Sequence, residues 1–139
     1  MQDKIIGVFE RADFPEFGIK SIQTKIDSGA YTGSLHCTRV IEEKVGDTTV
    51  IHFSPFDYPN IKITTDKFKV SGVRSSNGKS EDRYFISTLI SIKGETYPIE
   101  LSLADRSSMK WPVLIGRRFL RSNQFLVDFN GKKSVRRKK

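Results

Sequence analysis

The chain has 139 residues, enough for one domain, and 37% of them are hydrophobic, as in an ordinary globular protein. No apolar run approaches the roughly 18 residues that a membrane-spanning helix needs, and no apolar stretch of a signal peptide opens the chain. We therefore expect a cytoplasmic protein without a membrane segment, in which the single cysteine, Cys37, forms no internal disulfide.

The net charge of +8 is concentrated at one end of the chain. Six basic residues stand in the last eight positions: Lys132, Lys133, Arg136, Arg137, Lys138 and Lys139. Without these six, 18 of the 24 basic residues remain against 16 acidic ones, so the body is nearly neutral. This pattern predicts a domain over 1–131 and a flexible basic tail over 132–139, which is either solvated or in contact with RNA, a ribosome or an acidic partner.

The hydrophobic pattern has the period of two that is typical of strands, with Ile22 and Ile26 on one face and Gln23 and Lys25 on the other. In chain order we expect strands at Lys4–Glu10, Lys20–Ile26, Ser34–Ile41, Thr49–Phe53, Lys67–Val73, Arg83–Ile92, Tyr97–Leu103, Val113–Ile115 and Gln124–Phe129. Many short strands at close spacing indicate an all-β sandwich or barrel.

The first segment whose residues could carry out a reaction is the turn that begins at Asp27, directly after an apolar strand. An aspartate at this position is held rigidly and, beside a second carboxylate, can share one proton and activate a water. Gly29 would let the backbone fold tightly beneath the carboxylates, and Ser28 could bond to a partner loop. Asp-Ser-Gly is also a common turn sequence, in which the aspartate only caps amides.

Two later segments complete the pattern. The polar stretch from Arg74 to Asp82 contains Asn77-Gly78, a strong hairpin signal, and is either a surface loop or a lid over an extended substrate. Val113–Ile115, ended by Gly116, is either a plain core strand or a strand that passes close beside the Asp27 loop. A single helical turn is expected at Arg117–Arg121.

Taken in order, these segments resemble the retroviral type of aspartic protease and, more closely, a bacterial family labelled ATP-dependent zinc proteases. The resemblance covers nearly the whole chain and is carried by Lys25–Ala30, Thr32–His36, Arg74–Gly78, Arg83-Tyr84, Pro98–Leu103, Arg106–Met109, Leu114–Arg117 and Phe125–Asp128. It implies a closed or partly open six-stranded retropepsin-like barrel with one short helix after Gly116. It also implies a homodimer in which Asp27 of each chain forms the catalytic pair that hydrolyses peptide bonds.

The resemblance also implies roles for other residues. Asp27 is the expected catalytic residue, and the expected supports of its loop are Ser28, Gly29, Ala30, Gly116 and Arg117. The expected contacts of a peptide or protein substrate are Arg74, Ser75, Ser76, Asn77, Gly78 and Arg83. The residues expected beside the site are His36, Arg106, Ser107 and Ser108. For His36 a structural and a catalytic role both stay open, and Arg117 could pair with an acidic group or be exposed.

The family often accompanies ATP-grasp ligases that add glutamates to a ribosomal protein, which suggests a functional link by analogy alone. The charged hairpin is typical of contact with a polar or acidic substrate, or of a hairpin that does not move. There is no His-Glu-x-x-His motif, and His36 and Cys37 should point to opposite faces of a strand, so we expect no metal. Without a phosphate-binding loop we expect no cofactor, and any ATP dependence would belong to a partner.

Two other functions fit the sequence. The chain could be a non-catalytic dimeric module that binds a peptide or regulates a partner such as an ATP-grasp ligase. It could also be a small RNA-binding barrel in which Phe53, Phe56, Tyr58 and Phe68 stack on bases, although the near-neutral body favours nucleic-acid contact only through the tail. Glu100 is expected to face solvent, and Trp111 to be a packed anchor or an interface residue.

Overall fold

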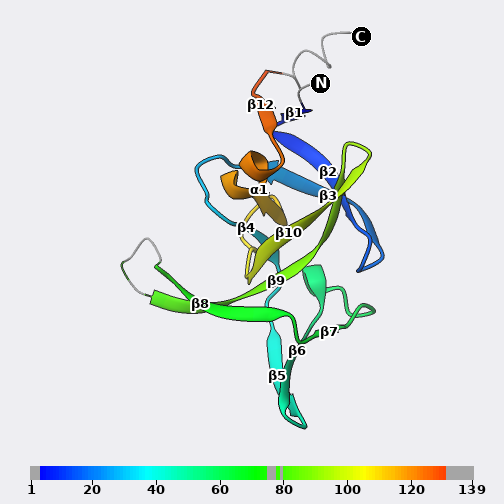
Figure 1. The fold of residues 1–139 in the computed structure, drawn as a ribbon, viewed down its shortest axis with the longest axis vertical. Helices are drawn as coiled ribbons and strands as arrows, with labels where there is room; N and C mark the ends of the chain where they lie inside the picture. Colours follow the sequence, from blue (N-terminus) through cyan, green and yellow to red (C-terminus); the bar gives the residue numbers. More distant parts are fainter. Residues whose placement is uncertain (1–3, 75–77, 79, 131–139) are drawn as a thin grey trace.

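The computed structural model describes residues 4–74, 78 and 80–130, and these residues are arranged mainly in strands (Figure 1). The strands are β1 (Lys4–Gly7), β2 (Phe9–Phe14), β3 (Ile19–Ile26), β4 (Gly33–His36), β5 (Val40–Val45), β6 (Thr48–Phe53), β7 (Ile63–Thr65), β8 (Phe68–Arg74), β9 (Ser80–Ile92), β10 (Glu95–Ala104), β11 (Val113–Ile115) and β12 (Phe125–Asp128). The helical elements are the 3₁₀ turn η1 (Pro55–Asp57) and the helix α1 (Arg117–Ser122). The predicted tail over 132–139 lies outside the described residues.

Six strands form a closed barrel in the order β10–β4–β11–β3–β2–β9. The barrel closes because β9 also pairs antiparallel with β10, from Ile92 opposite Glu95 to Phe85 opposite Ser102. Strand β8 pairs only with β9 and extends that hairpin away from the barrel. The predicted all-β six-stranded barrel with one short helix after Gly116 is therefore confirmed.

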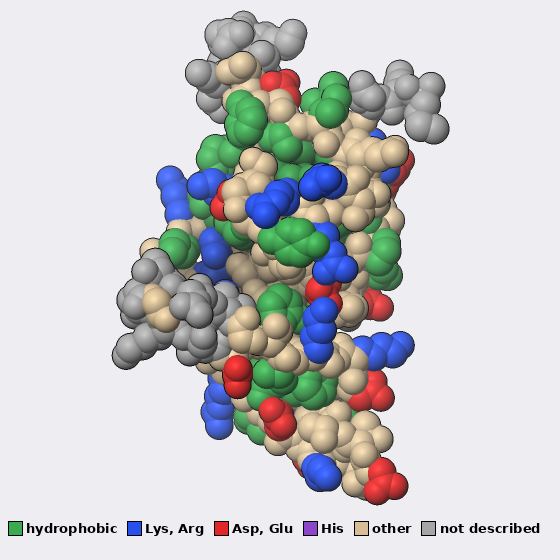
Figure 2. All heavy atoms as spheres, turned by 60° about the vertical axis from the view of Figure 1, so that its left-hand side comes forward, with side chains coloured by type: hydrophobic (Ala, Val, Ile, Leu, Met, Phe, Trp, Pro, Cys, Tyr) green, Lys and Arg blue, Asp and Glu red, His purple; other side chains and the backbone are tan. Residues whose placement is uncertain are grey.

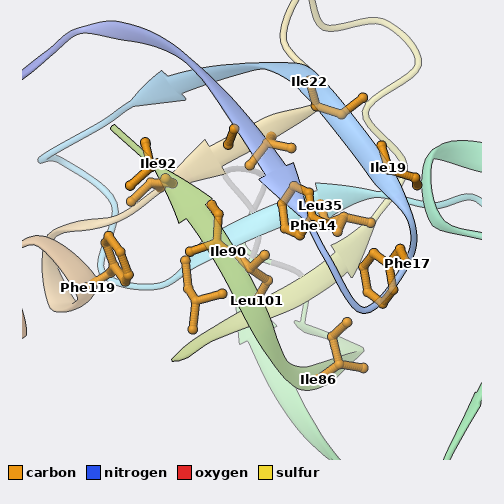
Figure 3. Packing of buried hydrophobic residues seen from close by; sticks show 14 of the residues in the cluster. Phe14, Phe17, Ile19, Ile22, Leu35, Ile86, Ile90, Ile92, Leu101 and Phe119 are labelled. Atoms are coloured by element: carbon orange, nitrogen blue, oxygen red, sulfur yellow. The ribbon is translucent and has the colours of Figure 1, made fainter. Parts of the chain in front are cut away.

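The barrel interior is filled by the apolar side chains that the period-two pattern places on one face of each strand. Phe14, Leu35, Ile90 and Leu101 are completely buried and lie among the side chains shown in Figure 3. Burial of one such side chain stabilises the fold by roughly 1.5–3 kcal/mol relative to exposure. The core therefore fixes the register of the strands that lead to the candidate site.

Strand β11 lies between β3 and β4, two strands that are consecutive in sequence. It runs parallel to β3 and antiparallel to β4. This insertion needs a glycine on β4, because a Cβ at Gly33 would lie only 2.0 Å from the carbonyl oxygen of Leu114. The chain between β3 and β4, which begins with Asp27, is thereby bound to a strand from the C-terminal third of the sequence.

Two smaller sheets flank the barrel. Strands β5, β6 and β7 form an antiparallel sheet that projects at the lower end of Figure 1. Strands β1 and β12 pair in parallel, so the first and last strands lie side by side at the upper end. In this pair Ile5 stands opposite Leu126, and each side chain is about half exposed, at 52%.

Most of the expected strands are present with shifted ends, but two of them are wrong as single strands. Lys4–Glu10 is interrupted at Val8, whose carbonyl oxygen accepts a hydrogen bond of 2.7 Å from the amide of Ile26. After this break β2 continues to Phe14 in a direction that lets it pair with both β3 and β9. This bond from Ile26 lies outside the regular pairing of β2 with β3, and the sequence pattern does not predict it.

The expected strand Ser34–Ile41 likewise ends at His36, and a separate strand starts at Val40. Between them, the amide of Cys37 still donates to the carbonyl of Ala104 at 2.9 Å, but Thr38 bonds to the side chain of Asp57. The chain turns there from the barrel into the three-stranded sheet. The short strand β7 was not predicted, because its three residues carry no alternation long enough to identify.

None of the helices in the described part of the chain is both long and apolar enough to cross a membrane.

Candidate active site

Asp27 is the first residue after β3, and its main chain is held by β11. Its amide donates to the carbonyl oxygen of Ile115 at 2.9 Å, and its carbonyl oxygen accepts from the amide of Ala30 at 3.2 Å. The first bond continues the ladder in which Ile26 pairs with Ile115. The position of Asp27 is therefore set by two core strands as well as by its own turn.

The turn after β3 also orients the Asp27 carboxylate. The amide of Gly29 donates to Oδ1 at 2.9 Å, and a Cβ at Gly29 would lie only 3.1 Å from the same oxygen. Asp27 is half-buried, whereas Ser28 and Gly29 are exposed. The carboxylate is thus fixed in direction while it stays near the surface, which is the geometry that a general acid or base needs.

The start of α1 binds the carbonyl groups of this loop. The amides of Arg117 and Arg118 donate to the carbonyl oxygens of Ala30 and Tyr31 at 2.7 and 3.0 Å. The guanidinium of Arg117 donates to the carbonyl oxygen of Gly29 at 3.1 Å and lies 5.4 Å from the centre of the Tyr31 ring. Arg117 is exposed, and its hydrogen-bond partner within the described part of this chain is a carbonyl group; pairing with an acidic group across a dimer stays a prediction.

Gly116 lets α1 begin directly against the loop. A Cβ on Gly116 would lie 2.6 Å from the carbonyl oxygen of Tyr31 and 2.8 Å from that of Ala30. Both distances are shorter than real Cβ contacts, so only glycine fits. The expectation that the strand ending at Gly116 passes close beside the Asp27 loop is confirmed.

Arg106 brings a half-buried positive charge towards Asp27 from the loop between β10 and β11. Its Nε donates to the carbonyl oxygen of Trp111 at 2.9 Å and its Nη1 to Oγ of the buried Ser34 at 3.2 Å. Desolvation, followed by repulsion from Arg83, lowers the pKa of Arg106, and the charge of Asp27 acts in the opposite direction. The charges of both Arg83 and Asp27 therefore act on Arg106.

Two of the five N–H donors of the Arg106 guanidinium are engaged within the described part of the chain. No acidic side chain among the described residues forms an ion pair with this guanidinium. A partly desolvated cation that lacks such a partner is well placed to bind an anionic ligand.

His36, at the end of β4, connects Arg106 to Asp57. Its Nδ1 accepts from the amide of Arg106 at 2.8 Å, and its Nε2 lies 3.0 Å from Oδ2 of Asp57. Asp57 was missed at the sequence level, because it is distant from His36 in sequence and η1 brings it there only after the chain has passed through β5 and β6. No local sequence signal marks this pair.

Cys37, the residue after His36, lies just past the end of β4. Cys37 is buried in the core, and desolvation raises the pKa of its thiol. Among the residues that the structure describes, no group of three or more His, Cys, Asp or Glu side chains is arranged to hold a metal ion.

Ser107 and Ser108 lie on the same loop as Arg106 and are exposed. The amide and hydroxyl of Ser107 donate to Oδ1 of Asp105 at 2.9 and 2.5 Å, and these bonds lower the pKa of Asp105. None of the hydrogen bonds between described residues joins either serine to Asp27.

The charged hairpin is formed by β8 and β9, whose last registered pair is Arg74 opposite Ser80. Residues 75–77, which include three of the expected substrate contacts, lie outside the described residues, and Gly78 has a φ of +86°. Arg83 lies on β9, opposite Ser71. In Figure 1 this hairpin and the loop between β3 and β4 project towards the same side of the molecule.

Glu100 does not face open solvent as expected. Its side chain is only 25% exposed and binds Arg118 at 3.0 Å and Lys69 at 3.2 Å. With Tyr31 and Arg118 it lines a cavity of about 310 Å³. The alternation of residues along β10 does not predict that Lys69 and Arg118, from two other elements, cover Glu100.

The aromatic platform expected for an RNA-binding barrel is not formed. Phe53 and Phe56 are buried in the core, and Phe68 packs against it. Only Tyr58, at 42% exposure, is available among the four. Trp111, by contrast, packs within the chain, stacked on Phe9 with ring centres 4.6 Å apart, while its role at an interface stays a prediction.

The chain matches the family model described as RimB-like, retropepsin-like aspartic endopeptidase RimB, over residues 5–139. It is also similar to proteins named "Probable alpha-L-glutamate ligase". It is 36% identical to the one from Shewanella pealeana over 129 residues, which are 89% of this chain and 28% of that protein. It is 31% identical to the one from Parasynechococcus marenigrum over 132 residues, or 91% of this chain and 28% of that protein. The chain thus spans little more than a quarter of the length of these relatives.

The fold is shared with a solved structure of a Legionella pneumophila protein of unknown function, Lpg0085. The TM-score is 0.73, with 20% sequence identity over 92% of this chain and 95% of that one. This match shows the fold alone.

Proposed function

Because the chain belongs to the RimB-like family of retropepsin-like aspartic endopeptidases, we propose that it hydrolyses peptide bonds with Asp27 as its catalytic carboxylate. The observation that carries the proposal is the bond of 2.9 Å from the Gly29 amide to the Asp27 carboxylate, in a loop held by β11 and α1. In the reaction, one carboxylate removes a proton from a water as the water oxygen attacks the scissile carbonyl carbon. A second, protonated carboxylic acid donates its proton to the carbonyl oxygen.

The second carboxylate is Asp27 of another copy of the chain. No hydrogen bond in the described part of the chain joins Asp27 to another acidic side chain. Ser28 and Gly29 are exposed at the tip of the loop, where a second loop could meet them on a two-fold axis. The apolar pair Ile5 and Leu126, on the sheet of terminal strands, supplies a surface for the same interface.

Leu126→Glu should weaken dimerisation and cleavage together. A two-fold interface contains each substituted position twice, so loss of two buried leucines at roughly 1.5 kcal/mol each weakens association about 100-fold. Sedimentation equilibrium and cleavage of a peptide library, both measured over a range of protein concentrations, test this expectation. Activity per chain should rise with concentration in parallel with the dimer fraction.

Val45→Glu is the matched control, because Val45 is an equally exposed apolar residue at the end of β5, on a different sheet. The Val45→Glu variant should dimerise and cleave peptides as the parent protein does. Full activity in a strictly monomeric protein would rule out the shared pair of carboxylates.

The substrate that we propose is an acidic peptide rich in glutamate. Arg106 has N–H donors that no described residue engages, and with Arg83 nearby it supplies positive charge beside Asp27. Figure 2 shows Lys and Arg side chains gathered over the middle of the face that comes forward from the left of Figure 1. The relatives named alpha-L-glutamate ligase support a glutamate-containing substrate. That this substrate is a ribosomal protein modified by such a ligase in the cytoplasm is proposed from the family resemblance alone.

Arg106→Gln should reduce cleavage of a glutamate-containing peptide by about 10- to 100-fold relative to the same peptide with glutamine. The reason is loss of a charge-assisted hydrogen bond worth roughly 1.5–3 kcal/mol. The measurement is kcat/KM for the two peptides. Arg11→Gln, which removes an exposed arginine that binds the carbonyl of Ser21, is the control and should keep the preference. An unchanged preference in the Arg106 variant would remove this residue from the substrate site.

A second candidate function is a non-catalytic dimeric module that binds and regulates a glutamate ligase. The observation in its favour is that the chain corresponds to about 28% of proteins that are themselves named ligases. Stable binding of acidic peptides without any cleavage would favour this function.

A further inference from the structure

The first and last parts of the loop between β10 and β11 are both hydrogen-bonded to His36. The main-chain amide of His36 donates to the carbonyl oxygen of Pro112 at 2.8 Å, while its Nδ1 accepts from the amide of Arg106 at 2.8 Å. One residue of β4 therefore holds both the first and the last part of the loop that carries Arg106.

The hydrogen bonds determine the tautomer of His36. A main-chain N–H can only donate, so the Nδ1 that receives the Arg106 amide carries no proton. The proton of the neutral ring is then on Nε2, from which it is donated to Oδ2 of Asp57 at 3.0 Å. Each ring nitrogen thus has a distinct and complementary partner.

Asp57 is itself held firmly. Its Oδ1 accepts from the amide and the hydroxyl of Thr38 at 2.9 and 3.1 Å. Asp57 and Phe56 both have a φ of +58°, a left-handed conformation that non-glycine residues adopt only where the surroundings hold them. The carboxylate of Asp57, in the turn that follows β6, is therefore a rigid acceptor that orients the ring of His36.

Among the described residues, Arg106 has two hydrogen bonds to the barrel, and both are to β4. Its bond to Trp111 lies within its own loop and moves with that loop. The remaining bonds go to Ser34 and His36, alternate residues of one strand whose side chains point to the same face. Ser34 binds the end of the side chain, whereas His36 fixes the main chain from which that side chain starts.

We propose that His36 is a positioning residue, which sets the guanidinium of Arg106 at the distance from Asp27 that an acidic substrate side chain requires. The proposal rests on the proposed function, in which Arg106 binds that side chain. It assigns His36 no contact with the scissile bond. The ring acts through the main chain of Arg106, and Asp57 keeps the ring in the required tautomer.

Two substitutions separate the two halves of the ring. His36→Asn keeps an acceptor at the δ position for the amide of Arg106, whereas His36→Gln keeps a donor at the ε position for Asp57 and loses that acceptor. We measure kcat and KM of each dimer for paired peptides that differ only in glutamate or glutamine. His52→Gln is the control, because His52 binds Glu43 and Thr64 on the three-stranded sheet.

We expect His36→Gln to raise KM for the glutamate peptide on the order of tenfold, with kcat for the glutamine peptide almost unchanged. His36→Asn and His52→Gln should keep the preference for glutamate. A purely structural role would instead lower kcat/KM equally for both peptides in both His36 variants. That result, or an unchanged preference in His36→Gln, would overturn the proposal while leaving the peptidase function intact.

A wild-type dimer that cleaves neither peptide, or shows no preference, would instead contradict the proposed function itself, and the role of His36 would fall with it. If His36→Gln does not fold, long-range ¹H–¹⁵N spectra of the wild-type protein test the central step. The ring must carry its proton on Nε2, and a proton on Nδ1 would exclude the bond from Arg106.

Discussion

Asp27→Asn should abolish peptide cleavage while leaving the fold and the dimer intact. Asparagine preserves the shape of the side chain and an oxygen that can accept from the Gly29 amide, but it cannot take up or release the proton. Positioned acid–base catalysis contributes about 10²–10⁴-fold, and we expect a loss of at least this size. Cleavage products of a peptide library, identified by mass spectrometry, give the measurement.

The control is Asp47→Asn, at the exposed turn between β5 and β6, which should be fully active. Mixing gives a sharper result, because a shared pair of carboxylates makes every mixed dimer inactive. Equal amounts of parent and Asp27→Asn chains should re-equilibrate to about a quarter of the activity of the same total amount of parent protein. A value of one half would mean that each chain works alone, and chelator-sensitive cleavage in the pure variant would move the chemistry to a metal.

Gly116→Ala should cause the second large loss, this time through the fold. The new Cβ would lie 2.6 Å from the carbonyl oxygen of Tyr31, and main-chain atoms of a strand and a loop can move apart only by breaking their hydrogen bonds. We expect a decrease in the free energy of unfolding of about 1–3 kcal/mol, and a further loss of activity as the Asp27 loop shifts. Chemical denaturation and peptide cleavage measure the two effects.

Gly72→Ala is the matched control for this substitution. Gly72 lies in β8, and a Cβ there would have no atom within 4 Å. This variant should be as stable as the parent. Equal stability of the Gly116 variant would show that the contact of α1 with the loop can relax, and would remove Gly116 from the support of the site.

The parts of the fold that the sequence predicted correctly are those in which local pattern and long-range packing agree. Val113–Ile115 was expected as a buried strand because three aliphatic residues stand before a glycine, and it has those bounds. The close approach of Gly116 to the Asp27 loop followed from the family resemblance and from the small size of glycine, and the short distances from Gly116 to the carbonyls of Ala30 and Tyr31 agree with it.

The errors come from contacts between residues that are distant in sequence. The strand from Ser34 ends at His36 because Thr38 and His36 both bind Asp57, which no local pattern connects to them. Phe53 and Phe56 were considered as base-stacking residues of an RNA-binding barrel, yet both belong to the buried core. The orientation of Arg106 depends on two side chains of β4, and spacing along the sequence does not encode it.

The position of β11 between β3 and β4 has a consequence for the order of events during synthesis. The carbonyl of Ile115 that receives the Asp27 amide belongs to a part of the chain that a ribosome makes long after Asp27 itself. Domains fold only when the segments that complete their core have emerged. A nascent chain therefore carries Asp27 without the strand that fixes it until Ile115 has been made, and only then can the carboxylate acquire its geometry. If the chain has the peptidase activity proposed above, a chain that still lacks β11 should be inactive.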